Sequence, residues 1–158
     1  MKVKSLGGGM VAISQQWLIN RYTQGAILPE YYFFQTPDSH GKIAVPLASL
    51  KLWERKHDEY IAKEKKLKQC AKLNAKGTAY EKQGKVKQAI KTYEKNIEGD
   101  CYPATHSFDR LMILYRKAKD YDNELRVCEK AIAVLKLSKY IERKDKILLL
   151  KQKQSASK

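Results

Sequence analysis

The chain lacks several features that would place it in a special class of protein. No run of its 158 residues approaches the length of about eighteen apolar positions that a membrane-spanning helix needs. Four prolines and eight glycines are too few for a collagen-like or proline-rich chain. The first residues are basic but lack the apolar stretch of a secretory signal. With 43% hydrophobic and 31% charged residues, we expect a globular chain that buries a core.

Cysteines are also few. Cys70, Cys101 and Cys128 are odd in number and widely spaced, which predicts neither a disulfide framework nor a zinc site. We therefore expect free thiols, a reducing environment and a cytoplasmic location.

Patterns typical of enzymes are weak or missing. The pair Pro37-Asp38 followed by Glu54-Arg55-Lys56 has the spacing of a metal-dependent nuclease motif, but the second part lies in a helical pattern where the motif needs a strand. No second histidine stands at ligand spacing from His57, and no phosphate-loop lysine follows the glycines at 7–9. The sequence predicts a protein without catalytic residues, metal or cofactor.

One quantity is extreme, namely a net charge of +15. Residues 1–29 contain no acidic residue, residues 63–76 hold six lysines against one glutamate, and residues 136–153 are also basic. Such charge favours an anionic partner, but lysines spread over helices are equally typical of a solvated face.

The second half of the chain matches itself at an offset of 35 residues. Small and apolar residues recur at spacings of three and four in both copies, which predicts two pairs of amphipathic helices over residues 70–138. Gly77 and Ala89 would let the first two helices approach closely, Tyr80 and Tyr93 would fill the space between them, and Pro103 would separate the copies.

This pattern resembles the tetratricopeptide repeat family over about residues 70–137. The first copy carries Gly77, Tyr80, Ala89 and Tyr93 in register, whereas the second is degenerate, with Met112 and Glu124 replacing the family's Gly and Ala. The resemblance implies an α-solenoid fragment whose pairs bury their apolar faces on their neighbours. Residues 139–153 are then expected to form a terminal capping helix or a dimer contact, and 154–158 a disordered tail.

In that family the first helix of each pair lines a groove that holds an extended peptide. By register, the groove residues here are Asn74, Thr78, Glu81, Lys82, His106, Asp109, Ile113 and Arg116. Asn74 and Asp109 do not reproduce the set with which some members clamp a terminal carboxylate, so that specialised activity is not expected. A packing role for these residues is the alternative.

The N-terminal third has a different pattern. A helix is expected over residues 14–23, with Ser14 as its N-cap and Gly25 as its stop. Two short runs, at 31–35 and 42–45, are β-like, and the turn formers between them predict a hairpin. Pro46 then opens another helix, which serves as a connection over residues 46–69.

This order resembles the winged-helix units of excisionase and MerR-type DNA-binding proteins, over residues 14–29 and 41–53. The resemblance implies that the helix at residues 14–23 enters the major groove and that the hairpin forms a wing. The residues it assigns to DNA are Gln15, Gln16, Asn20, Arg21, His40 and Lys42. In that family another helix precedes this one, but here the glycines at 7–9 would break it. Either that preceding helix is very short or the scaffold has another shape.

Together these patterns predict a mainly α protein: helical pairs of the tetratricopeptide type, with a small basic α+β unit at residues 1–45. The expected function is that of an intracellular regulator or adapter that binds a protein partner through the helices and double-stranded DNA through the N-terminal unit. One alternative is a protein-binding scaffold whose N-terminal unit is only a cap that buries Trp17, Trp53 and the aromatic run at 31–34. Another is that a basic helix of the chain binds an anionic membrane surface. The sequence also leaves open that the chain forms a homodimer.

Overall fold

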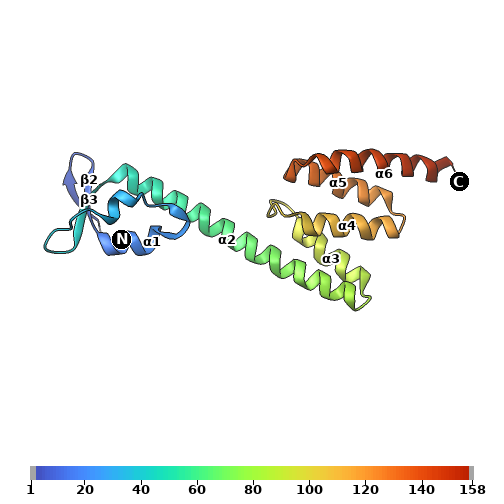
Figure 1. The fold of residues 1–158 in the computed structure, drawn as a ribbon, viewed down its shortest axis with the longest axis horizontal. Helices are drawn as coiled ribbons and strands as arrows, with labels where there is room; N and C mark the ends of the chain where they lie inside the picture. Colours follow the sequence, from blue (N-terminus) through green and yellow to red (C-terminus); the bar gives the residue numbers. More distant parts are fainter. Residues whose placement is uncertain (1–2, 157–158) are drawn as a thin grey trace. The chain divides into compact units, whose positions relative to one another are not determined.

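The computed structural model describes residues 3–156 and is mainly helical, with a small antiparallel sheet near the N-terminus (Figure 1). Its backbone divides into two compact parts, Met1–Glu64 (unit 1) and Lys65–Lys158 (unit 2). No helix in the described range 3–156 is both long and apolar enough to cross a membrane.

Unit 1 begins with a β-hairpin. Strands β1 (Lys4–Gly7) and β2 (Met10–Ser14) pair antiparallel, and the glycines at 7–9 form the turn with positive φ angles. Strand β3 (Lys42–Pro46) pairs with the other edge of β2, which gives the sheet order β1-β2-β3. The segment before residue 14, in which the glycines would break a helix, therefore forms two strands of the sheet.

Helix α1 (Gln15–Tyr22) follows β2 directly. The Ser14 hydroxyl accepts a hydrogen bond from the Trp17 backbone N–H at 3.3 Å, and Gly25 adopts a φ of 72° just beyond the helix. Leu18 and Tyr22 are fully buried. The predicted helix, its cap and its stop are confirmed.

The predicted hairpin at residues 31–45 is wrong. Residues Glu30–Phe33 form a 3₁₀ helix (η2), and the loop at 36–41 leads into β3, whose ladder partner is β2. Intrinsic β-propensity is easily overridden by the tertiary context of a segment. The η2 segment is held instead by the Gln15 side chain, whose amide donates to the Tyr32 and Gln35 carbonyls at 2.9 and 2.7 Å.

The core of unit 1 lies between the sheet, α1 and the first turns of α2 (Leu47–Lys82). Leu50 and Trp53 of α2 are buried in it with Val11, Ile13 and other apolar residues. The N-terminal unit therefore has a core of its own that includes the start of the helix expected as a connection. Of the aromatic run at 31–34, Tyr32 and Phe33 pack against this core, whereas Tyr31 and Phe34 are 66% and 83% exposed, so the burial expected of a capping unit is found only in part.

Unit 2 is a series of antiparallel helices, made of the second half of α2, α3 (Val86–Ile97), α4 (Thr105–Lys117), α5 (Tyr121–Leu135) and α6 (Ser138–Ala156). Gly77 lies against the buried Tyr93 ring, and a Cβ atom there would stand 2.8 Å from its Cδ1 atom and closer still to its Cε1 and Cζ atoms. Ala89 is also fully buried. The predicted close approach of the first helical pair is thus present. Helix α6 extends to Ala156, into the tail expected to be disordered, and residues 157–158 of that tail lie outside the described residues.

Candidate functional site

Two of the six residues assigned to DNA are engaged inside unit 1. Gln15 is one, because its side-chain amide holds the η2 segment as described above. Arg21 is the other. Its Nε and Nη2 atoms donate to the two carboxylate oxygens of Glu54 on α2, at 3.1 and 2.9 Å. A guanidinium fixed in this bidentate way is less available for a base edge.

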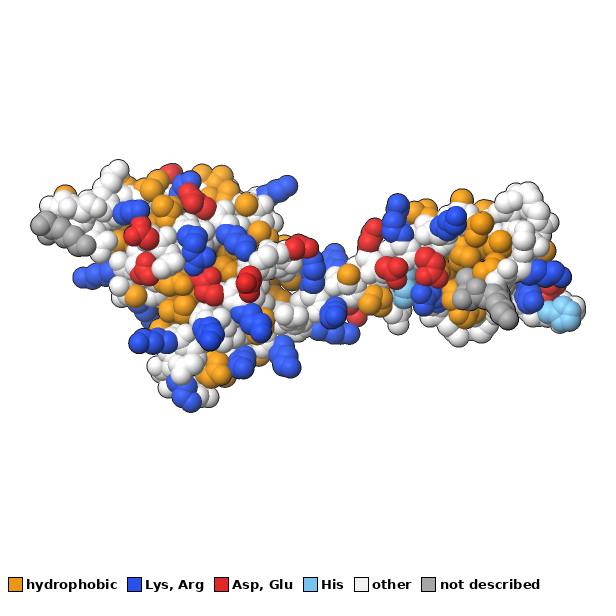
Figure 2. Space-filling view, turned by 180° about the vertical axis from the view of Figure 1, so that it is seen from behind, with side chains coloured by type: hydrophobic (Ala, Val, Ile, Leu, Met, Phe, Trp, Pro, Cys, Tyr) orange, Lys and Arg blue, Asp and Glu red, His pale blue; other side chains and the backbone are white. Residues whose placement is uncertain are grey.

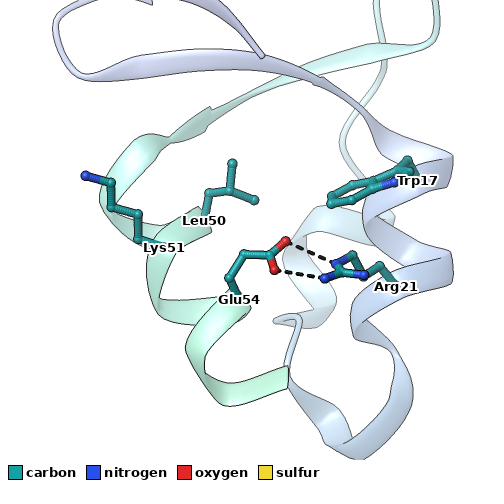
Figure 3. Close-up of a pocket in the computed structure, with 5 residues that line it drawn as sticks. All are labelled: Trp17, Arg21, Leu50, Lys51 and Glu54. Atoms are coloured by element: carbon teal, nitrogen blue, oxygen red, sulfur yellow. Dashed lines mark hydrogen bonds and ion pairs between the residues drawn. The ribbon is translucent and has the colours of Figure 1, made fainter. Parts of the chain in front are cut away.

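The Arg21–Glu54 pair borders a pocket of about 580 Å³ between α1 and α2 (Figure 3). Trp17 lies beside Arg21, whose guanidinium carbon is 5.5 Å from the indole centroid. Tyr22 donates a further hydrogen bond to Glu54. The hydrogen bonds from Arg21, and less strongly from Tyr22, hold the pKa of the Glu54 carboxyl below its usual value. Figure 3 shows the Lys51 ammonium pointing away from Arg21 and Glu54.

The other four assigned residues remain accessible to different degrees. Gln16 and Asn20 are exposed one turn apart on α1, and their side chains bond to each other at 2.8 Å. His40 is exposed and Lys42 half-buried. Their backbone N–H groups both bond to the Asp38 carboxylate, at 2.8 and 2.9 Å, and this holds its pKa below the usual value. His40 therefore lies in an ordered loop and Lys42 begins strand β3, which pairs with β2, so neither is at the tip of the predicted hairpin.

In unit 2, the residues assigned to the groove lie on α2 and α4. The Asn74 oxygen accepts hydrogen bonds from Asn96 at 2.8 Å and from Ser107 at 2.6 Å. The Thr78 hydroxyl lies 3.3 Å from both the Tyr93 hydroxyl and the His106 Nε2 atom. Asn74 and Thr78 thus tie α2 to α3 and α4, which supports the packing role that was the alternative for them.

Glu81 has the same kind of role. Its carboxylate accepts from Tyr93 at 2.8 Å and from the Arg110 Nε at 2.9 Å, with a second bond from the Arg110 guanidinium. The hydrogen bonds from Arg110, followed by that from Tyr93, lower the pKa of Glu81 despite its partial burial. Lys82, the last residue of α2, is exposed.

The remaining assigned residues, Asp109, Ile113 and Arg116, come together at a pocket of about 600 Å³ between α4 and α6. Asp109 accepts from the Lys139 ammonium at 3.1 Å and from the Tyr140 hydroxyl at 3.0 Å. We call this pocket the α4/α6 groove; it is lined by Asp109, Ile113, Arg116, Lys139, Tyr140, Glu142, Arg143 and Lys146. Four basic residues against two acidic ones make it a basic site with an apolar part.

Below this groove lies a buried carboxylate. Glu124 of α5, which stands 35 residues after the buried Ala89, is 0% exposed. Its oxygens accept from the Arg116 Nε and Nη2 at 2.6 and 2.8 Å, and from the Arg143 Nη2 at 3.3 Å. The Arg143 Nε, by contrast, is a buried donor without a hydrogen-bond partner among the described residues. A charged residue at this position of the second copy was therefore a signal of the charged triad, although the sequence did not identify the two arginines as its partners.

Within residues 3–156, no three His, Cys, Asp or Glu side chains gather where they could hold a metal ion. Comparison of the chain with protein-family models, curated proteins and solved structures finds no match. The interpretation of the DNA-binding residues in unit 1 and of the α4/α6 groove in unit 2 therefore depends on the geometry of this chain.

Proposed function

We propose that unit 2 is a protein-interaction module that holds an extended acidic segment of a partner protein in the α4/α6 groove. The observation that carries the proposal is the groove's lining, in which Arg116, Lys139, Arg143 and Lys146 surround Ile113 and Tyr140. Opposite charge attracts an acidic peptide and fixes its register, while the apolar part supplies contact area. No catalytic step is involved.

The resemblance to the tetratricopeptide family supports the same proposal. Helices α2 and α4 are the first helices of the two predicted pairs, and α6 follows as the next helix in that position. Side chains of α4 join both neighbours, because Arg110 binds Glu81 of α2 and Asp109 binds Lys139 of α6. The three helices are therefore tied together, and the groove available to an extended segment lies between α4 and α6.

The test uses the full chain and fluorescent peptides of about twelve residues that alternate Asp or Glu with Leu or Ile. Lys146 is exposed at the groove and makes no ion pair with a described residue, so Lys146→Glu reverses a charge without breaking a contact. We expect binding weakened by about tenfold, or about 1.4 kcal/mol. Ile113→Ala should weaken binding at every salt concentration.

The matched control is Lys117→Glu, an exposed charge reversal at the end of α4 and outside the groove lining. Equal losses for Lys117→Glu and Lys146→Glu would mean that only the net charge matters and would contradict a groove site. Equal affinity for an alternating Lys/Leu peptide would do the same.

DNA binding by unit 1 is the second candidate. The observation that favours it is the exposed pair Gln16 and Asn20, whose amides suit adenine edges. Its test is the affinity for duplex DNA of Gln16→Ala with Asn20→Ala, since neither side chain bonds to the unit's core. Unchanged affinity on every duplex tested would reject it.

A further inference from the structure

The positive charge is concentrated in unit 2. Residues 65–158 hold 24 basic and 11 acidic residues, whereas residues 1–64 hold 8 and 6. Most of this excess lies at 65–95, where ten lysines face only two acidic residues, Glu81 and Glu94. These lysines are Lys65, Lys66, Lys68, Lys72, Lys76, Lys82, Lys85, Lys87, Lys91 and Lys95.

Both acidic side chains of this stretch are already neutralised by arginines of later helices. Glu81 binds Arg110, and the Glu94 carboxylate accepts from Arg126 at 2.5 Å and from the Tyr115 hydroxyl at 2.7 Å. They therefore do not screen the lysines of α2 and α3. Charges on the later helices are more often paired, for example Lys144 with Glu129 and Lys151 with Asp122.

The unpaired lysines of the two helices lie on a common side. Gln69 and Lys95 line the same shallow pocket between α2 and α3, together with Glu98, Asp100 and Lys66, whose ammonium pairs with Asp100. Lys72 and Lys76 follow Gln69 by three and seven residues, which places them on the same side of α2. Lys87 and Lys91 precede Lys95 by eight and four residues on α3, so they share its side.

We call Lys72, Lys76, Lys87, Lys91 and Lys95 the lysine face. All five are exposed, and none makes an ion pair with a residue in the described range. Figure 2 shows Lys and Arg side chains scattered over the face of unit 2 that it draws, with Asp and Glu side chains between them, and further Lys and Arg at the end where α2 and α3 meet. Tight packing beneath, with Gly77 against Tyr93, holds the two helices together.

We propose that the lysine face binds the phosphate backbone of double-stranded nucleic acid, independently of the α4/α6 groove and of α1. Successive lysines on α3 are about 6 Å apart along the helix, close to the length of two base-pair steps, about 6.8 Å. The face holds lysines and no arginine, which suits point contacts to phosphates rather than bidentate contacts to bases. Binding is therefore independent of sequence.

An anionic membrane would attract the same lysines, but among the described residues of α2 and α3 in unit 2 the exposed large apolar side chains are two single ones, Leu67 and Val86. The apolar residues Ala89, Tyr93 and Ile97 of α3 are buried in the core of unit 2. Interfacial helices need a free apolar face for insertion. Nucleic acid, which needs only charge at fixed spacing, is the partner that fits.

The experiment measures the affinity of the full chain for labelled duplex DNA of about 20 base pairs between about 50 and about 200 mM salt. The test variant is Lys72→Gln with Lys87→Gln and Lys91→Gln. The control removes the same charge elsewhere, by Lys117→Gln with Lys130→Gln and Lys136→Gln, three further lysines without ion pairs to described residues. Circular dichroism verifies that both variants are folded.

If three phosphate contacts are lost, the slope of log affinity against log salt should become shallower by about 2.7. We expect at least a tenfold loss of affinity at the lower salt, on any duplex sequence, and a much smaller loss in the control. Unchanged binding by Lys146→Glu would add support, because it separates this surface from the groove of the proposed function.

Three results would overturn the proposal. The first is an equal loss in the control variant, which would assign binding to net charge alone. The second is loss of binding with the α1 variant Gln16→Ala/Asn20→Ala but not with the lysine variant. The third is lysine-dependent binding to vesicles containing phosphatidylserine without binding to DNA, which would identify the partner as a membrane.

Discussion

Replacing Glu124 tests whether the charged triad is a structural requirement of unit 2. The change is Glu124→Leu, which keeps much of the side-chain volume but removes the carboxylate that Arg116 and Arg143 share. Removing one member of a buried ion pair costs about 3–5 kcal/mol, because the partner charge is left uncompensated. Here the two arginine side chains are 35% and 28% exposed and can recover part of their hydration. We therefore expect a loss of about 2–3 kcal/mol in the free energy of unfolding.

The cause of this loss can be separated from packing by removing all three charges together. A variant with Glu124→Leu, Arg116→Leu and Arg143→Met has no charge left to compensate, and such replacements are often neutral or stabilising. We expect its stability to lie within about 1 kcal/mol of the parent chain. Glu129→Leu, on the exposed side of the same helix, is the control and should cost less than about 1 kcal/mol.

The assay is urea unfolding followed by two signals. Both tryptophans, Trp17 and Trp53, lie in unit 1, so their fluorescence reports on that unit, whereas circular dichroism reports on the helices of both. Glu124→Leu should shift the dichroism transition and leave the fluorescence transition nearly in place. The reasoning is refuted if Glu124→Leu is neutral, or if the triple variant is as unstable as the single one.

Three further predictions concern unit 2. Gly77→Ala should destabilise it by about 1–3 kcal/mol in urea unfolding, because the new Cβ meets the Tyr93 ring; a gain of about 1 kcal/mol, as in an open helix, would contradict this packing. Since Arg110 lowers the folded-state pKa of Glu81, the pair stabilises unit 2 fully above the ordinary pKa of about 4.5. This stabilisation is lost as pH falls from that value through the lower folded-state pKa. Unfolding at neutral and acid pH should show the difference between the parent chain and Glu81→Gln shrinking at acid pH, and a constant difference would refute it. The half-buried Cys101 should react with a thiol reagent first, whereas Cys70 and Cys128 are buried, and burial raises the pKa of the Cys128 thiol. Mass spectrometry of the labelled sites identifies the order, and early labelling of Cys128 would be the contrary result.

The sequence predicted best those features that depend on near neighbours in the chain. Ser14 as a cap is a local hydrogen bond, and the contact of Gly77 with Tyr93 joins two adjacent helices at a recurrent spacing. The strand expected at 31–35 failed because pairing is decided by distant residues. Strand β2 already pairs with β3, and the Gln15 side chain occupies the carbonyls that a ladder would need.

The candidate sites were predicted less well, for the same reason. Arg21 looked free in a stretch without acidic residues, but its partner Glu54 lies 33 residues away on α2. At Glu124 the sequence did carry a signal, since a charged residue stands 35 residues after the small Ala89, at the same position of the second copy. Its two arginines come from different helices and were beyond what spacing could identify.

The placement of charge also distinguishes the two proposed ligands of unit 2. Arg116 and Arg143 in the α4/α6 groove are already bound to Glu124, and Lys139 to Asp109. An acidic peptide there gains less from these charges, and part of its affinity comes from contact with Ile113. The lysine face has no such internal partners among the described residues, so its phosphate contacts should release counterions in full. Peptide binding should therefore depend on salt much less steeply than DNA binding when both are titrated on the same chain. Equal slopes would mean that the internal ion pairs do not screen the groove, and that the two surfaces act through net charge alone.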